Sequence, residues 1–191
     1  MTILILGLLL FLGIHSIRIL AEPARQGLIE RLGLWGYKGL YSAIALVGFG
    51  LIIVGYGQAR LEPTVLYQLP VGVRHMSLLL LVPAFPALLA AYFPGRISDK
   101  LKHPMLVAVK IWAVAHLLAN GTLADVLLFG GFLTWAVLDR ISVGRRASTG
   151  GGAQLPRTPF NDVIVIAGGL GLYVAFLFWL HPLLIGVPAV G

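Results

Sequence analysis

Residues 101–125 read LKHPMLVAVKIWAVAHLLANGTLAD. Most of this stretch is apolar, but five polar or aromatic side chains interrupt or border the apolar run: Lys110, Trp112, His116, Asn120 and Asp125. Ionisable groups are costly inside a lipid bilayer, so those found there commonly mark a functional site. We therefore expect this stretch to carry both membrane segments and the chemistry of the chain.

The composition predicts an integral membrane protein. Of the 191 residues, 59% are hydrophobic and only 11% are charged, whereas a soluble domain has about 25% charged residues. The length suits a single membrane domain over residues 1–191, with the bilayer as its main partner. The net charge of +7 comes from residues in short loops between apolar runs, which indicates membrane orientation rather than nucleic-acid binding. Cysteine is absent, which excludes disulfides and thiolate chemistry.

Six hydrophobic segments predict an all-α polytopic membrane helical bundle, because about 20 apolar residues cross a bilayer as a helix. Their uncharged stretches are residues 3–17, 39–59, 75–95, 111–124, 126–138 and 163–191. Asn120-Gly121 is a strong turn signal, so we expect the fourth and fifth segments to form a short hairpin. Thr122 followed by Asp125 resembles a capping box at the start of the fifth.

Further features predict how these segments bend and pack. Pro83 and Pro86 should kink the third segment. Two sets of small residues should allow close helix packing: Gly48, Gly50, Gly55 and Gly57 in the second segment, and Ala167, Gly171 and Ala175 in the sixth. Residues 21–38 read as an amphipathic interfacial segment. Residues 143–159, rich in Gly, Ser and Pro, predict a flexible cytoplasmic loop.

The distribution of Lys and Arg predicts the orientation. The connections after the first, third and fifth segments carry four, three and four basic residues, whereas the opposite side carries only Arg60 and Arg74. The positive-inside rule then places the three basic connections in the cytoplasm and both termini outside it. We expect a multi-pass protein of the bacterial inner (plasma) membrane. Lys110 should reach a water-accessible boundary.

Five histidines are the main candidates for chemistry, since no phosphate loop, dinucleotide fingerprint or metalloprotease helix is present. His15 and His116 lie within apolar segments. Each could bond to a neighbouring helix, or the two could share a metal such as a heme iron. Trp112, His116 and Asn120 recur at i, i+4 and i+8 and should share a helix face, although Asn120 could instead cap the turn. His103-Pro104 reads equally as a helix start or as a polar group at a cavity mouth.

The sequence resembles the NnrU family of bacterial membrane proteins. The resemblance rests on the pairs His-Pro, Ile-Trp, Ala-His and Asn-Gly between residues 103 and 121. It also rests on His15-Ser16, Arg-Leu-Gly at residues 31–33, and the Tyr-x3-Tyr-Ser pattern that ends at Ser42. It covers nearly the whole chain. NnrU proteins are associated with denitrification and nitric oxide metabolism.

That family is similar to 15-cis-zeta-carotene isomerase, a heme b enzyme that isomerises a carotenoid double bond. The similarity implies heme b ligation by His15 and His116, with Ala113 where the isomerase has a cysteine. Three functions follow: a heme protein of nitrogen-oxide metabolism, a heme-dependent isomerase acting on a lipophilic polyene substrate, or a heme-free scaffold.

Two ligands of one iron must lie at similar membrane depth. His15 is ~8 Å from the cytoplasmic end of its segment at 1.5 Å per residue. If the fourth segment begins at Pro104, His116 is ~18 Å deep, whereas if Lys110 marks the cytoplasmic interface the depth is ~9 Å and the hairpin turns back before it crosses the membrane fully. The short fourth and fifth segments favour the second version, in which the two histidines converge.

Overall fold

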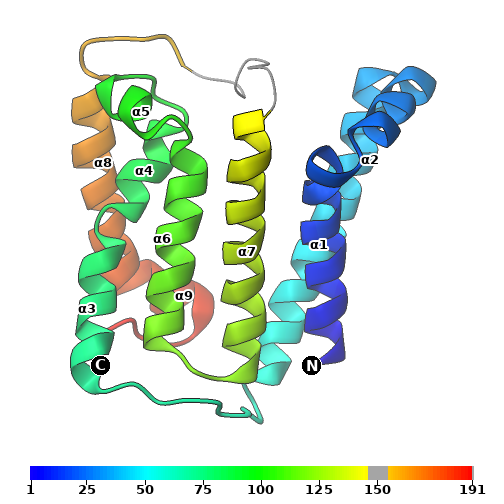
Figure 1. The fold of residues 1–191 in the computed structure, drawn as a ribbon. Coiled ribbons are helices and arrows are strands. Elements are labelled where there is room, and N and C mark those ends of the chain that lie inside the picture. Colours follow the sequence, from blue (N-terminus) through cyan, green and yellow to red (C-terminus); the bar gives the residue numbers. More distant parts are fainter. Residues whose placement is uncertain (146–154, 191) are drawn as a thin grey trace. The chain divides into compact units, whose positions relative to one another are not determined.

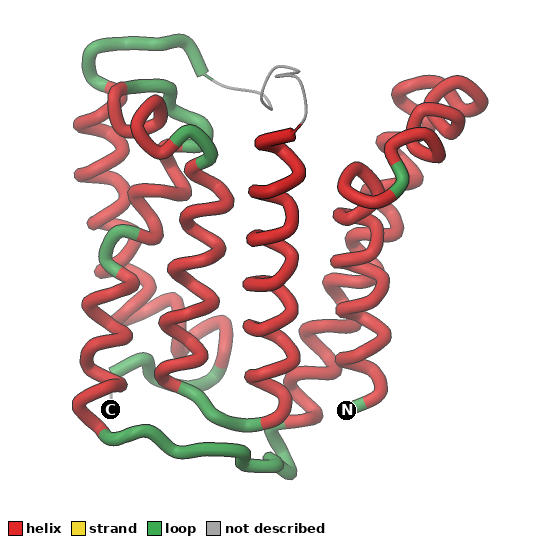
Figure 2. The backbone as a smooth tube through the Cα atoms, in the orientation of Figure 1, coloured by secondary structure: helices red, strands yellow, loops and turns green. Residues whose placement is uncertain are grey.

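The structure is a computed structural model that describes residues 1–145 and 155–190. In these ranges the chain is almost entirely helical, with one isolated bridge between Val65 and Thr122 (Figures 1 and 2). The helices are α1 (Thr2–Leu20), α2 (Glu22–Ala59), α3 (Val71–Leu81), α4 (Ala84–Ala90), α5 (Arg96–Leu101), α6 (Pro104–Ala119), α7 (Leu123–Arg145), α8 (Asn161–Ala175), the π-helix η1 (Phe176–Leu180) and α9 (His181–Ile185).

Five helical stretches are long and apolar enough to cross a membrane: Thr2–Leu20, Glu22–Ala59, Val71–Ala90, Leu123–Arg145 and Asn161–Ile185. A further apolar helix, α6, has 16 residues. These helices confirm the all-α membrane fold, with α6 as the shortest of the six segments. Helix α7 is longer than its uncharged stretch because the helix continues through Asp139 and Arg140 to Arg145.

The helices form two compact units. One contains α1, α2 and α7 (residues 1–69 and 120–145), and we call it the α1–α2–α7 unit. The other contains α3–α6, α8, η1 and α9, and we call it the α3–α9 unit. The single domain expected for residues 1–191 stays a prediction.

Glycines bring α1 and α2 into backbone contact. A Cβ atom on Gly48 would lie 2.7 Å from the Phe11 nitrogen, and one on Gly7 would lie 2.6 Å from the Ile52 nitrogen. Gly55 likewise meets the backbone of Leu4. By contrast, Gly50 and Gly57 have nothing within 4 Å. The predicted close approach is therefore confirmed for two of the four glycines, which lie seven residues apart on one face of α2.

Helix α2 has a break at Gly33, where φ is 71° and ψ is 164°. This left-handed φ favours glycine, and it separates residues 22–32 from the long apolar part of α2. Trp35 just after the break is 81% exposed, with the ammonium group of Lys38 4.9 Å from the centre of its ring. Tryptophan and lysine side by side are typical of a membrane interface, which agrees with the predicted interfacial segment.

Prolines interrupt the third segment as predicted, since α3 ends at Leu81 and α4 begins at Ala84. The Val82 N–H bonds to the carbonyl of Leu79 instead of that of Leu78. The released Leu78 carbonyl accepts a hydrogen bond of 3.0 Å from the hydroxyl of Tyr173 on α8. A backbone group freed in an apolar region is thus satisfied by a side chain of another helix.

The packing face of α8 differs from the predicted one. Ala167 and Gly171 are exposed, whereas Val165 and Gly169 are buried and Gly169 meets the backbone of Pro86 on α4. The predicted stripe of Ala167, Gly171 and Ala175 is therefore wrong as a packing face. Small-residue spacing recurs on more than one face of this helix, and only the partner helix decides which face is used.

The α6–α7 connection is three residues long and contains the predicted capping box. Asp125 accepts hydrogen bonds from the Thr122 N–H (2.9 Å) and hydroxyl (2.6 Å), and the Asp125 N–H donates to the Thr122 hydroxyl (3.3 Å). A second acidic cap starts α5, where Asp162 accepts from the N–H groups of Arg96 and Ile97. Of the predicted loop at residues 143–159, residues 146–154 lie outside the described ranges.

Candidate functional site

His15 has a fixed orientation on α1. Its Nδ1 lies 2.6 Å from the Phe11 carbonyl one turn earlier. Because a carbonyl only accepts, Nδ1 carries the proton and Nε2 has the free lone pair. Leu4, Leu8, Phe11 and His15 recur every three or four residues, so they lie on the face of α1 that packs against its neighbours. A partly buried imidazole in this tautomer is a ready metal ligand or hydrogen-bond acceptor.

An aromatic cluster from three helices surrounds His15. The Phe11 ring stacks on the imidazole with centroids 4.2 Å apart. Tyr41 of α2 and Trp135 of α7 contact it edge-on at 5.3 and 5.9 Å. Phe132 adds a further ring beside Phe11. The cluster holds the imidazole in an apolar environment within the α1–α2–α7 unit.

Two polar atoms of this cluster are unpaired. The indole nitrogen of Trp135 is the one buried side-chain nitrogen or oxygen, among residues 1–145 and 155–190, without a hydrogen-bond partner. In the same described part of the chain, no hydrogen bond is made by the hydroxyl of Tyr41. Sequence reasoning missed both residues. The Tyr-x3-Tyr-Ser pattern included Tyr41, and the only signal for Trp135 was a Trp within an apolar stretch.

His116 lies on α6 in the α3–α9 unit and has the same local geometry as His15. Its Nδ1 donates to the Trp112 carbonyl at 2.8 Å, and the two rings lie 5.3 Å apart. The predicted shared face of Trp112 and His116 is therefore confirmed. Asn120 directly follows the last residue of α6, Ala119, and its place on this face stays a prediction. Its carbonyl instead accepts from the hydroxyl of Tyr67 at 2.9 Å, because the chain turns at Asn120-Gly121.

His103 occupies the junction between α5 and α6. Lys102 before it has φ of 61°, and Pro104 after it is the first residue of α6. The predicted helix start is thus confirmed. Lys110 is the seventh residue of α6 and is half-buried. Helix geometry continues back to Pro104, so α6 begins before Lys110, but the start of the helix does not fix the membrane boundary. The location of Lys110 at a water boundary stays a prediction.

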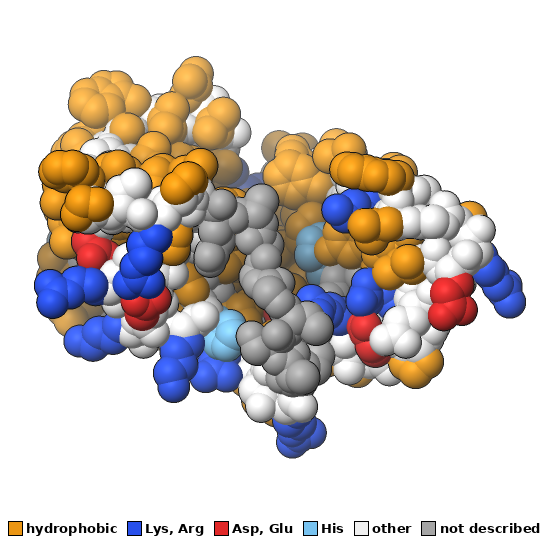
Figure 3. Space-filling view, turned by 90° about the horizontal axis from the view of Figure 1, so that it is seen from above, with side chains coloured by type: hydrophobic (Ala, Val, Ile, Leu, Met, Phe, Trp, Pro, Cys, Tyr) orange, Lys and Arg blue, Asp and Glu red, His pale blue; other side chains and the backbone are white. Residues whose placement is uncertain are grey.

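Basic residues gather at one end of each unit (Figure 3). Arg18, Arg140 and Arg145 lie where α1 and α7 end, and Arg60 follows the far end of α2. In the α3–α9 unit, Arg157 pairs with Asp99 of α5 at 2.5 Å and holds the pKa of that carboxyl below its usual value.

The two histidines differ in their position along their own units. His15 is five residues from the end of α1, at the basic end of its unit. His116 is three residues from the end of α6, and α6 starts beside the basic α5. Whether the two histidines meet stays a prediction.

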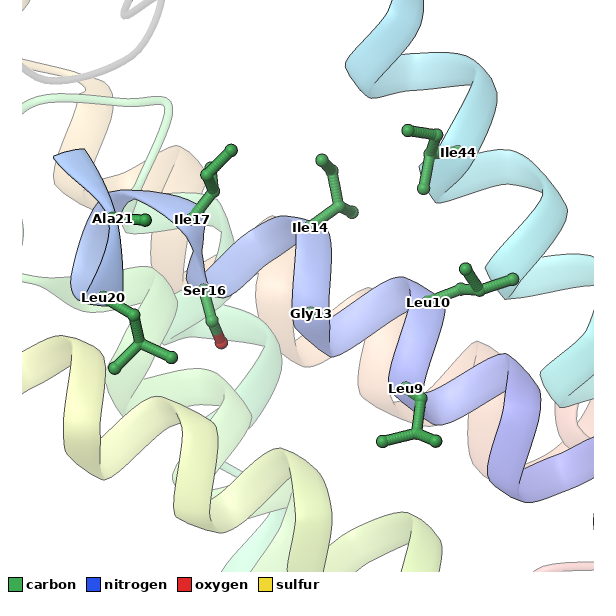
Figure 4. Close-up of a pocket in the computed structure, with 9 residues that line it drawn as sticks. All are labelled: Leu9, Leu10, Gly13, Ile14, Ser16, Ile17, Leu20, Ala21 and Ile44. Atoms are coloured by element: carbon green, nitrogen blue, oxygen red, sulfur yellow. The ribbon is translucent and has the colours of Figure 1, made fainter. Parts of the chain in front are cut away.

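An apolar groove of about 350 Å³ runs along α1 (Figure 4). Its lining includes Leu10, Gly13, Ile17 and Ile44 of α2, with Ser16 as the polar residue. These α1 positions recur every three or four residues on the face opposite to the one that carries His15. The groove and the aromatic cluster are therefore separate features.

A family model described as "NnrU protein" matches residues 3–189 of the chain. No curated protein and no solved structure matches it.

Proposed function

Because the chain belongs to the NnrU family, we propose that it binds heme b through His15 and His116 and acts in nitrogen-oxide metabolism. The observation that carries the proposal is the shared geometry of the two histidines. In each, Nδ1 donates to the carbonyl four residues earlier, at 2.6 and 2.8 Å. Metal-bound histidines usually donate their other N–H in this way, which fixes the orientation of the ring.

The donor set suits heme iron. Neutral imidazole nitrogens are common iron ligands, and a heme takes its other four ligands from the porphyrin. Two histidines on separate helices are therefore sufficient. When bound, the iron supplies a redox-active centre that also binds small ligands. The aromatic rings around His15 exclude water from that side of the site.

The positions of the histidines define two ligation modes. His15 lies ~8 Å from the basic end of its unit, and His116 lies ~18 Å along α6 from the basic α5. For one iron to take both, the two imidazoles have to lie at similar membrane depth, which they do if Lys110 marks the cytoplasmic interface and His116 is ~9 Å deep. Ligation by His15 alone would not need this match in depth, and it would leave the iron able to bind a small ligand. We propose the two-histidine mode and treat the other as an outcome of the test.

An absorption spectrum of the purified protein tests the proposal. Two-histidine ligation gives a six-coordinate low-spin spectrum, which His15→Ala and His116→Ala should each abolish. His75→Ala and His181→Ala are matched controls that should leave it unchanged, since both residues lie outside the proposed site. If only His15→Ala changes the spectrum, the one-histidine mode holds. Absence of heme from the wild-type protein would leave the scaffold function.

The isomerase alternative needs a lipid-accessible cavity beside the iron ligands. The groove of Figure 4 lies on the face of α1 opposite to His15, and Ala113, where the isomerase has a cysteine, is fully buried. The position of the groove and the replacement of that cysteine by Ala113 weigh against the isomerase alternative. Pigment analysis of a deletion strain tests this choice, because loss of an isomerase would accumulate a cis-polyene.

A further inference from the structure

We propose that Tyr41 and Trp135 form a binding site for a membrane-dissolved quinone, a flat apolar ring with carbonyl oxygens. The proposal goes beyond the heme function and does not rest on it. It uses the Tyr41 hydroxyl on α2 and the indole N–H of Trp135 on α7, whereas the heme proposal uses Nε2 of His15. Three observations carry it: an orphan buried donor, a second unpaired donor in the same aromatic cluster, and the flat aromatic rings of that cluster.

The Trp135 N–H is the first observation. An indole nitrogen only donates, and buried tryptophans usually place it against an acceptor. Here the nitrogen is buried and has none among the described residues. Each such group in a native structure calls for an explanation, because leaving a buried donor unpaired costs about 1–3 kcal/mol. A ligand with an acceptor atom removes that cost when it binds.

The hydroxyl of Tyr41 is the second observation. Its ring and that of Trp135 both contact the imidazole of His15 edge-on, at 5.3 and 5.9 Å between ring centres. In the described ranges this hydroxyl forms no hydrogen bond. Two helices thus present one unused donor each to the same cluster. Two donors call for a ligand with acceptor oxygens rather than one with a positive charge.

The surroundings decide the class of ligand. The cluster also contains the rings of Phe11, His15 and Phe132, which favour a flat ring through offset or edge contacts. The cluster lies between helices that are apolar enough to cross a membrane, so its ligand has to be soluble in lipid. Quinones combine the three properties: lipid solubility, a flat ring and carbonyl oxygens that only accept.

Calorimetric titration of the full-length protein in lipid nanodiscs tests the proposal. The probes are menadione and its oxygen-free counterpart methylnaphthalene, with empty nanodiscs subtracted. We expect menadione to bind saturably and more tightly than methylnaphthalene. Tyr41→Phe keeps the ring and removes only the hydroxyl donor, and Trp135→Phe keeps an aromatic side chain but removes the N–H donor, so each should weaken menadione binding roughly 3- to 10-fold, the range for one lost hydrogen bond. Neither should change binding of methylnaphthalene.

Trp179→Phe is the matched control, because Trp179 is 65% exposed and lies in η1, and it should bind menadione as the wild type does. The thermal stability of the ligand-free protein distinguishes a binding role of Trp135 from a purely structural one. Trp135→Phe removes an unsatisfied donor, so the ligand-free thermal midpoint should stay equal or rise. Equal affinity of the wild type for the two probes, or unchanged menadione binding in both donor variants, would overturn the proposal.

The heme content of each sample separates this proposal from the previous one. The Soret band reports heme, and the calorimeter reports menadione. Loss of heme in His116→Ala, a residue outside the aromatic cluster, with menadione binding retained supports two independent functions. If Trp135→Phe releases heme and leaves menadione binding unchanged, the indole belongs to the heme site and the quinone proposal is wrong.

Discussion

Replacement of Asp125 by Ala should strongly destabilise the α1–α2–α7 unit. Asp125 is 4% exposed, and its carboxylate accepts three hydrogen bonds. One comes from the hydroxyl of Tyr56 on α2 at 2.6 Å, and the other two come from the N–H and hydroxyl of Thr122. The side chain therefore joins the end of α2 to the start of α7.

The magnitude follows from those bonds. Asp125→Ala removes the capping box, at a cost of about 0.5–2 kcal/mol. It also leaves the buried Tyr56 hydroxyl and the Thr122 N–H without an acceptor, at about 1–3 kcal/mol each. Because Thr122 is counted in both estimates, we expect a total loss of about 3–5 kcal/mol. Tyr56→Phe removes a single charge-assisted bond, so it should cost about 1.5–3 kcal/mol.

Unfolding in mixed detergent micelles, followed by far-UV circular dichroism, measures these losses. Glu62→Gln is the matched control, since it also removes one carboxylate charge but Glu62 is exposed. The Asp125→Ala and Tyr56→Phe double variant should lose less than the sum of the single losses, because Phe at position 56 leaves no orphan hydroxyl. A loss below about 1 kcal/mol in Asp125→Ala, or strict additivity, would refute the assigned role of this carboxylate.

Three further predictions address packing, pH and orientation. Gly48→Leu should destabilise the protein by about 1–3 kcal/mol or more, because the Cβ of a residue at position 48 meets the Phe11 backbone. Gly50→Leu should not, since a Cβ at position 50 has nothing within 4 Å. Equal melting temperatures of the two variants would contradict the glycine contact. Arg157→Gln should slightly lower the melting temperature at pH values above 3.8, the ordinary pKa of the Asp99 carboxyl. The difference from the wild type should disappear as the pH falls through the lowered pKa of Asp99 in the folded protein. A difference in melting temperature that persists in acid would contradict the ion pair. Reporter fusions should place Arg145 in the cytoplasm and Gly191 outside, and the same side for both would contradict the predicted orientation.

The helices were predictable because each is decided by local properties of the sequence. A long apolar run predicts a membrane helix, a Pro in that run predicts a break, and Asn-Gly followed by Thr-x-x-Asp predicts a turn and a cap. The break before Ala84 and the bonds between Thr122 and Asp125 confirm these local predictions. In each case the groups that interact are within four residues of each other.

The residues that contact a neighbouring helix were less predictable. Gly48 and Gly50 are equivalent by composition, but only Gly48 meets another backbone. The same limit applies to α8, where Gly169 rather than Gly171 packs against α4. The orphan nitrogen of Trp135 is also a property of three helices together. No periodicity within one helix contains this information, because it depends on the rotation of the neighbouring helices.

The glycine contacts explain how the fold builds the aromatic cluster. Along the antiparallel pair, Gly55 meets Leu4 and Gly48 meets Phe11, so seven residues back along α2 correspond to seven forward along α1. Continued for about two more turns, this register brings Tyr41 level with Arg18, one turn beyond His15, and the Tyr41 ring contacts the imidazole with ring centres 5.3 Å apart. A bulky residue at position 48 would push the helices apart just below this level. The close approach at Gly48 is therefore the structural reason that Tyr41 reaches the imidazole, and a single packing glycine links the stability of the fold to the geometry of the proposed site.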